Sequence, residues 1–239
     1  EIRYRFPMFR INDGWVGLFE PRAGAVFPER CIQAFHSGLN RSGADIRLDE
    51  QVLSWSAAGS GIEVRTSSGT YGAERLVITA GAWITNLVEE LHTIVEIERL
   101  TLFMFEPARN ASSLTSEMCP NSSWGCVGEG DSFYTQPDFG NGFKVAFHHG
   151  QTGVDPDRLD RSTTKEEEAR VRHFVKEYIP DAAGRLREGA ACLYTNLPNK
   201  DWVIDRHPQE PRVVVGSPCS GHGFKFSAAI GEILADLTD

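Results

Sequence analysis

The strongest signal in the chain is the segment Gly216-Ser217-Pro218-Cys219-Ser220-Gly221-His222-Gly223-Phe224-Lys225-Phe226. It follows an apolar run at residues 212–216 that predicts a strand, and it leads into a predicted helix with apolar residues at Phe226, Ile230, Ile233, Leu234 and Leu237. A strand, a glycine-bearing turn and a helix N-terminus together present backbone N–H groups and the positive end of a helix dipole. Such a turn suits an anionic group or an electron-rich ring. Taken alone, these residues fit equally well a turn in which the glycines only supply geometry and Lys225 is solvated.

The first part of the chain predicts a helix followed by short strands. Pro28 opens the helix, and Ile32, Phe35 and Leu39 share one of its faces before Gly43 ends it. Short β-rich runs separated by glycine and serine turns follow at residues 46–48, 51–53, 62–66 and 75–79. The last run is continuously apolar, which is typical of a strand covered on both faces. A further helix containing Leu87, Val88 and Leu91 is expected after it.

The later part of the chain predicts an antiparallel sheet with one clear helix. Alternating segments occur at residues 100–105, 133–134 and 143–148, and further strands are expected near residues 190–195, 202–205 and 212–216. The polar stretch 107–123 predicts a loop. A helix at residues 165–178 has a capping box, Thr164 with Glu167, and ends before Pro180. These elements place the chain in the α+β class.

Composition narrows the classes of protein and partner. The chain has 239 residues, 41% of them hydrophobic, with a net charge of −9, so it is neither disordered nor collagenous. No window approaches the ~18 apolar residues of a membrane-spanning helix, and Lys and Arg are scattered, so neither a membrane nor nucleic acid is an expected partner. No CxxC pair occurs among Cys31, Cys119, Cys126, Cys192 and Cys219. The cysteines therefore indicate no disulfide framework and no zinc or other metal site, and a cytoplasmic location with reduced thiols is expected.

The segment at residues 216–226 resembles the C-terminal signature of the monomeric sarcosine oxidase family of flavin-dependent amine oxidases, in which it borders the isoalloxazine ring. Phe19-Glu20-Pro21 with Gly24, Val26-Phe27 and Cys31-Ile32 resembles the family's entry into a helix before its cofactor-domain hairpin. Val77-Ile78-Thr79-Ala80-Gly81-Ala82-Trp83 resembles its strand-to-helix flavin segment. Ala191-Cys192-Leu193-Tyr194-Thr195, followed by Asp205-Arg206-His207-Pro208, resembles the region around its flavin-attaching cysteine. The resemblance runs from about Arg5 to Leu237 and implies FAD as cofactor.

The resemblance assigns roles to individual residues. Cys192 matches the cysteine whose sulfur bonds the flavin 8α carbon, although from its residue type alone it would be an inert buried thiol. Lys144 matches the lysine that promotes reduction of molecular oxygen, since a preorganised ammonium stabilises developing negative charge. Alternation along its strand alone would favour a residue that points outward. Lys225 matches the lysine that helps to bind the substrate carboxylate, with a solvated first-turn lysine as the alternative.

Further residues are implied on the substrate and cofactor sides of the site. Tyr134, His148 and Tyr194 match side chains that line the substrate side of the flavin, while the adjacent His149 has no assigned role. Contacts with the cofactor are expected at Val52, Ala80, Gly81, Trp83, Gly221, His222 and Gly223, where the small residues allow close approach.

One element of such flavoproteins does not occur in the sequence. They begin with a strand, a Gly-x-Gly-x-x-Gly turn and a helix that hold the pyrophosphate, and no such motif is found here. The chain is therefore expected to be a fragment that lacks the N-terminal Rossmann βαβ unit. Residues 1–99 are expected to form part of the FAD-binding α/β domain, residues 100–195 an antiparallel-sheet substrate domain, and residues 196–239 a return to the FAD-binding domain.

The resemblance implies that the complete protein oxidises a secondary or N-methylated amino acid, transfers a hydride equivalent to flavin and produces hydrogen peroxide when oxygen reoxidises the flavin. The fragment itself is expected to be inactive and to lack FAD. Two alternatives remain open. A dehydrogenase of the same fold would pass electrons to a quinone or a partner protein, and a scaffold or binding module would retain the sheet without the cofactor.

Overall fold

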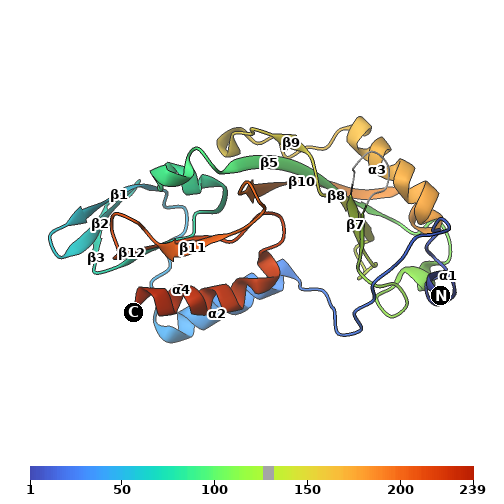
Figure 1. Cartoon of the computed structure of the whole chain (residues 1–239), viewed down its shortest axis with the longest axis horizontal. Helices are drawn as coiled ribbons and strands as arrows, with labels where there is room; N and C mark the ends of the chain where they lie inside the picture. The colour runs from blue at the N-terminus through green and yellow to red at the C-terminus, as the bar shows by residue number, and fades with distance from the viewer. Residues whose placement is uncertain (126–131) are drawn as a thin grey trace. The chain divides into compact units, whose positions relative to one another are not determined.

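The computed structural model describes residues 1–125 and 132–239, and these form two compact units (Figure 1). Unit 1 comprises Glu1–Ala25 and Glu98–Leu193, and unit 2 comprises Val26–Ile97 and Tyr194–Asp239. Cys126 lies outside the described residues. The described cysteines Cys31, Cys119, Cys192 and Cys219 are free thiols. No described helix combines the length and the apolar character that a membrane crossing requires.

Unit 1 is built on a sheet in the order β10-β5-β8-β7-β6, with β9 paired to β5. The strands are β5 (Glu96–Phe105), β6 (Ser122–Trp124), β7 (Phe133–Gln136), β8 (Phe143–Phe147), β9 (Gln151–Thr152) and β10 (Leu186–Asn196). Pairing is antiparallel between β5 and β8, β8 and β7, β7 and β6, and β5 and β9. The antiparallel character predicted for this region is confirmed by these pairings.

Helix α3 (Lys165–Tyr178) packs its apolar side against this sheet. It has the predicted bounds, because both halves of the capping box form between Thr164 and Glu167 and Pro180 follows its last turn. Val171, Val175 and Tyr178 are buried in an aromatic core that includes Phe103, Phe105, Phe133, Phe143 and Phe147. Burial of side chains of this size stabilises the fold by about 1.5–3 kcal/mol each.

The first residues of the chain complete the core of unit 1. After the short helix α1 (Ile2–Arg5), Met8 and Phe9 are buried in the same core, and Phe9 meets Trp124 edge-on with ring centroids 5.2 Å apart. Residues 1–25 therefore pack with unit 1 and not, as predicted, with the residues up to 99. The apolar side chains of Met8 and Phe9 pack against the antiparallel sheet.

Unit 2 contains two three-stranded sheets and two helices. The first sheet has the order β1-β2-β3 and is antiparallel, with β1 (Val52–Ala58), β2 (Gly61–Thr66) and β3 (Thr70–Ala73). The second has the order β11-β12-β4, in which β12 (Val213–Ser217) pairs antiparallel with β11 (Val203–Arg206) and parallel with β4 (Leu76–Ile78). The helices are α2 (Pro28–Ser42), which ends at Gly43 with a left-handed φ of 77°, and α4 (Ser227–Thr238). Mixed α+β architecture is thus confirmed.

Three expectations for unit 2 are wrong. Residues 46–48 form no strand, because Asp49 takes a left-handed φ of 55° and the side chain of Arg47 bonds to Asp45 and Tyr71. The expected helix around Leu87 consists of two 3₁₀ turns, η1 (Gly81–Asn86) and η2 (Glu89–Leu91), because Val88 between them is extended. Strand β4 is not covered on both faces: it lies at a sheet edge, and Val77 is 40% exposed.

Candidate functional site

Strand alternation in unit 1 places Tyr134, Lys144 and His148 on the sheet face that points away from the aromatic core. Phe143, Val145 and Phe147 on β8 are buried in that core, so the alternate positions Lys144 and His148 face the other way. Tyr134 on β7 pairs with Ala146 and shares this second face. The rings of Tyr134 and His148 are 4.8 Å apart, and the Lys144 Nζ lies 5.5 Å from the Tyr134 ring centroid. The structure therefore brings these predicted residues together.

This cluster combines three chemical functions within a small area. An ammonium above a phenol ring is attracted to the negative face of the π system. The backbone N–H of His148 donates a hydrogen bond to the Ser132 carbonyl oxygen at 3.0 Å, which fixes the start of the turn after β8. A cation, a phenol hydroxyl and an imidazole in contact can bind a small polar molecule, orient it and exchange a proton with it.

Cys192 lies on β10 of unit 1 and is partly buried. Burial raises the pKa of its thiol, while the positive charges of Lys144 and Arg99 oppose this rise. The thiol is therefore neutral at ordinary pH, but two cations favour its thiolate. Cys119 differs, because burial alone raises the pKa of its thiol to about 12.

In unit 2, the turn after β12 is shaped by two residues in the left-handed region. Ser220 has a φ of 42° and Gly221 a φ of 76°. Ser220 Oγ donates to the Asp201 carbonyl oxygen at 2.8 Å, and its N–H donates to the Thr195 carbonyl oxygen at 2.9 Å. A Cβ atom at Gly221 would overlap the ring of Tyr194, and one at Gly223 would overlap the Pro218 carbonyl. Both glycines are therefore required for this backbone path.

Other predicted residues of unit 2 flank this turn. His222 Nε2 donates a hydrogen bond to the Lys200 carbonyl oxygen at 3.0 Å. Lys225 is exposed in the 3₁₀ turn η6 (Phe224–Phe226), and its Nζ lies 5.9 Å from the Phe226 ring centroid. No side chain caps η6 or α4, and backbone bonds satisfy part of this end: the Ser227 N–H donates to the Phe224 carbonyl oxygen and the Phe226 N–H to the Gly223 carbonyl oxygen. Lys225 thus places a positive charge beside the turn.

The parallel pairing of β4 and β12 places a second predicted segment at the same end of the sheet as the turn after β12. Val215 pairs with Ile78, the last residue of β4, and β12 continues to Ser217; Ala80 and Gly81 follow β4, and the Ser220–Gly221 turn follows β12. Gly81 has a φ of 54°, and a Cβ atom there would meet nothing within 4 Å. Trp83 follows in η1 and is 38% exposed, whereas Val52 begins β1 in the other sheet. Ligands of open α/β sheets bind outside the carboxyl ends of the strands.

These features fit the ring end of FAD. Gly81 leaves open space at a left-handed position after β4, and the glycine turn follows the neighbouring strand β12. A flat ring can approach the backbone closely at such residues. For the pyrophosphate end the sequence offers no Gly-x-Gly-x-x-Gly motif. The described residues therefore fit one part of the cofactor.

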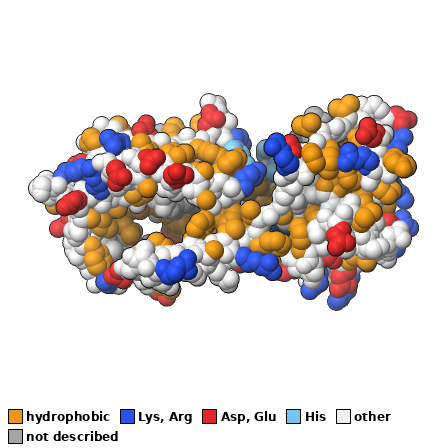
Figure 2. All heavy atoms as spheres, turned by 90° about the horizontal axis from the view of Figure 1, so that it is seen from below, with side chains coloured by type: hydrophobic (Ala, Val, Ile, Leu, Met, Phe, Trp, Pro, Cys, Tyr) orange, Lys and Arg blue, Asp and Glu red, His pale blue; other side chains and the backbone are white. Residues whose placement is uncertain are grey.

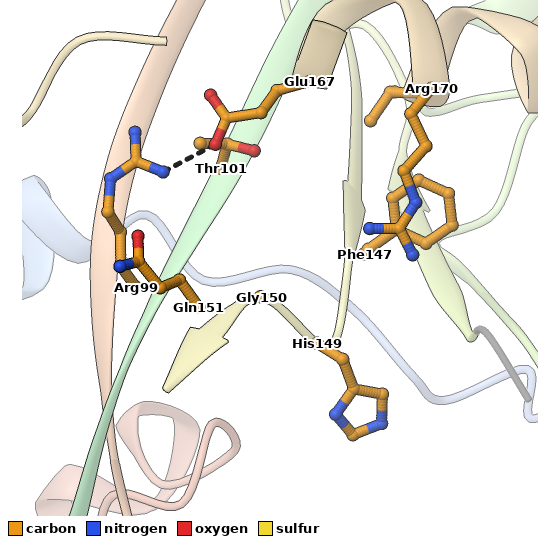
Figure 3. Close-up of a pocket in the computed structure, with 9 residues that line it drawn as sticks. Arg99, Thr101, Phe147, His149, Gly150, Gln151, Glu167 and Arg170 are labelled. Atoms are coloured by element: carbon orange, nitrogen blue, oxygen red, sulfur yellow. Dashed lines mark hydrogen bonds and ion pairs between the residues drawn. The ribbon is translucent and has the colours of Figure 1, made fainter. Parts of the chain in front are cut away.

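A small pocket lies on the α3 side of the sheet in unit 1 (Figure 3). Two pairs of side chains line its walls: Arg99 Nη1 lies 2.6 Å from Glu167 Oε1, and the Arg170 guanidinium lies 4.2 Å from the Phe147 ring centroid. Thr101, His149, Gly150, Gln151 and Val171 complete the lining. None of the residues predicted for the site lines this pocket.

Comparison with known proteins identifies the family to which the chain belongs. A family model described as FAD dependent oxidoreductase matches residues 1–237. The chain is 31% identical to a monomeric sarcosine oxidase of Bacillus sp. (strain B-0618), over 99% of this chain and 61% of that protein. It is 35% identical to a monomeric sarcosine oxidase of Streptomyces avermitilis (99% and 62% covered) and 28% identical to an N-methyl-L-tryptophan oxidase of Yersinia pestis (98% and 62%).

Solved structures show the same fold. NikD, described as an unusual amino acid oxidase essential for nikkomycin biosynthesis, superimposes with a TM-score of 0.75 at 20% identity, over 99% of this chain and 63% of that chain. A glycine oxidase from Geobacillus kaustophilus superimposes with a TM-score of 0.67 at 18% identity, over 86% and 52%. The chain spans about three fifths of the length of the curated relatives named above.

Proposed function

Because the chain belongs to the family of FAD-dependent oxidoreductases, we propose that the complete protein oxidises a secondary or N-methylated amino acid and reduces oxygen to hydrogen peroxide. The observation that carries the proposal is the convergence of Tyr134, Lys144 and His148 on one sheet face. FAD, when bound, supplies the redox chemistry, because it takes up a hydride equivalent from the amine carbon and returns the electrons to oxygen. The residues of this chain bind, orient and supply charge.

In unit 1, Lys144 provides the fixed positive charge that stabilises negative charge on oxygen as it is reduced. Tyr134 and His148 orient the amine, the first through its hydroxyl and the second through its imidazole. Cys192 attaches the flavin covalently. Burial raises the pKa of its thiol, and the positive charges of Lys144 and Arg99 oppose that rise.

In unit 2, Lys225 binds the substrate carboxylate as a point charge, and Tyr194 contributes its hydroxyl to substrate binding. Val52, Ala80, Gly81, Trp83, Gly221, His222 and Gly223 contact the cofactor. The segments around Gly81 and Gly221 follow the parallel neighbouring strands β4 and β12, and this supports the proposal. The pyrophosphate requires a further glycine-rich segment in addition to these 239 residues. We place the protein in the reducing cytoplasm, because its described cysteines are free.

The test uses the complete protein. We expect a flavin absorption spectrum, bleaching of that spectrum by an N-methyl amino acid under anaerobic conditions, and hydrogen peroxide on admission of air. Sarcosine, N-methyltryptophan and pipecolate are the substrates to compare. A flavin that the amine reduces but that only a quinone reoxidises would replace the oxidase by a dehydrogenase, and a colourless protein would leave a binding module.

A further inference from the structure

Glu98 is a buried carboxylate in unit 1 with no role in the reaction proposed above. It lies on β5 and is only 2% exposed. The backbone N–H of Gly150 donates a hydrogen bond to its Oε1 at 2.7 Å, and His149 Nδ1 lies 3.9 Å from the same oxygen. Because burial of a carboxylate is costly unless donors compensate it, its contact with this turn is a specific feature of the fold.

The turn that Glu98 contacts lies tightly against β5. It connects β8 to β9, and β9 pairs with β5 through Thr152 opposite Glu98 and Gln151 opposite Arg99. A Cβ atom at Gly150 would overlap the carbonyl oxygen of Arg99. Only glycine therefore fits at this point, and its N–H is directed at the acceptor that Glu98 provides.

The same turn carries His148. Its N–H is bonded to the Ser132 carbonyl oxygen at 3.0 Å on the β7 side, and its ring stands 4.8 Å from that of Tyr134. On the β5 side, the Gly150 N–H donates to Glu98 Oε1, and β9 pairs with β5 directly after the turn. The path of the backbone through His148 is thus held from both neighbouring strands.

We propose that Glu98 is a positioning residue: by accepting the Gly150 N–H, it fixes the turn at residues 148–150 and so sets the orientation of the His148 imidazole beside Tyr134. Its consequence for catalysis rests on the proposed function of His148. The positioning itself does not, since it concerns only contacts within unit 1. In the sequence, Glu98 lies between the apolar residues Ile97 and Leu100, which the structure shows to be buried.

Two conservative variants of the complete protein separate the position of the acceptor from its charge. Glu98→Asp keeps the charge but withdraws the oxygen from Gly150 by one methylene. Glu98→Gln keeps an acceptor oxygen at full length and removes the charge. Glu96→Gln, an exposed position on the same strand, is the matched control.

Two readouts need no activity: amide hydrogen exchange of the peptide that contains Gly150, and the ring resonances of His148 in histidine-labelled protein, assigned with His148→Gln. We expect Glu98→Asp to speed the exchange roughly tenfold and to shift the His148 resonances, while Glu98→Gln and Glu96→Gln resemble the parent. With substrate, Glu98→Asp should slow flavin reduction roughly 10- to 100-fold, and Glu98→Gln should restore most of the rate.

Failure of this inference and failure of the proposed function give different results. Parental exchange and His148 resonances in Glu98→Asp, or equal damage in Glu98→Asp and Glu98→Gln, would overturn the positioning role. If exchange and resonances follow the expected series in a protein that oxidises no amine, the positioning role stands and the proposed function fails.

Discussion

The ammonium of Lys144 lies 5.5 Å from the centre of the Tyr134 ring, across the antiparallel pair of β7 and β8. Gln136 is the residue directly opposite Lys144, so the contact with Tyr134 is diagonal. Diagonal neighbours on one sheet face are within reach of a long side chain and an aromatic ring. This contact holds the Lys144 charge at a defined place, which is what a charge must have to assist a reaction without reorganising.

Lys144→Met in the complete protein should therefore slow reoxidation of the reduced flavin by oxygen on the order of 100-fold, because a preorganised charge is lost. Reduction of the flavin by substrate should change much less. Stopped-flow measurements under anaerobic and aerated conditions separate the two steps. Lys176→Met, at an exposed position on α3, is the control. Equal slowing of both steps would contradict the role given to Lys144.

Lys225→Met should raise the substrate concentration needed for half-maximal flavin reduction roughly tenfold, because a charged hydrogen-bond donor to the carboxylate is removed. Reoxidation by oxygen should be unaffected. The dependence of the anaerobic reduction rate on substrate concentration measures the first effect. Lys165→Met, also exposed, should behave as the parent. An unchanged half-saturation value in Lys225→Met would leave Lys225 as a solvated residue.

Cys192→Ala should release flavin into the supernatant when the complete protein is precipitated with acid, whereas the parent should retain it in the pellet. The fold should persist, because the thiol fills little volume and is only partly buried. Cys219→Ala is the matched control: burial also raises the pKa of its thiol, and Thr195 is its hydrogen-bond partner. Flavin that stays in the Cys192→Ala pellet would exclude Cys192 as the attachment residue.

The elements that the sequence predicted well have local signals at both ends. Helix α3 has the predicted bounds because Thr164 and Glu167 start it and Pro180 follows it. Strand β4 and the expected helix around Leu87 had only apolar content to indicate them, and apolar content does not say whether another element covers it. The structure therefore differs from the prediction at both places: Val77 is exposed, and residues 81–91 form 3₁₀ turns and no α-helix.

The residues of unit 1 discussed above were predictable from the sequence to different extents. Alternation along β8 indicates that Lys144 and His148 share a face, but only the family resemblance gave that face a chemical meaning. Glu98 was missed because a glutamate in a strand ordinarily faces water, and its burial depends on the turn at Gly150, which lies far along the chain. Long-range contacts of this kind leave no local pattern.

The ion pair of Glu210 and Arg212 predicts a pH dependence of stability in unit 2. Hydrogen bonds from Arg212 lower the pKa of the Glu210 carboxyl from 4.5 to about 2, and Arg212 also donates to the Gly59 carbonyl oxygen. A carboxylate with a lowered folded-state pKa stabilises the fold above its unfolded pKa, and this stabilisation is lost as the pH falls through the folded value. The contribution of Glu210 should therefore be complete above about pH 4.5 and should disappear toward pH 2.

Thermal unfolding of the parent and of Glu210→Gln as a function of pH measures this contribution. The two curves should be separated at neutral pH and should converge below pH 4.5, provided that unfolding stays cooperative. Glu117→Gln, at an exposed position, should show no such convergence. A separation that is constant with pH would mean that the Glu210 carboxylate gains nothing from Arg212.

The isolated 239-residue chain should behave differently from the complete protein. Apolar side chains are exposed on unit 2, where Ile32, Phe35 and Leu39 on α2 are 48%, 45% and 44% exposed and Ile233 on α4 is 46% exposed. Figure 2 shows hydrophobic side chains among scattered charges on one face of the molecule. Exposed apolar surface of this kind is typical of an interface, so the chain alone should self-associate in solution. Light scattering across a concentration series measures the association.

The same chain should bind FAD weakly and show no oxidase activity. Without a Gly-x-Gly-x-x-Gly turn it lacks the N–H groups that hold a pyrophosphate, and its net charge of −9 repels the dianion. Titration with FAD, followed by flavin fluorescence, should therefore show no saturation at micromolar concentrations, and riboflavin, which lacks the pyrophosphate, should behave alike. Saturable FAD binding that riboflavin does not compete away would show that the described residues hold the pyrophosphate by a route other than the glycine-rich turn.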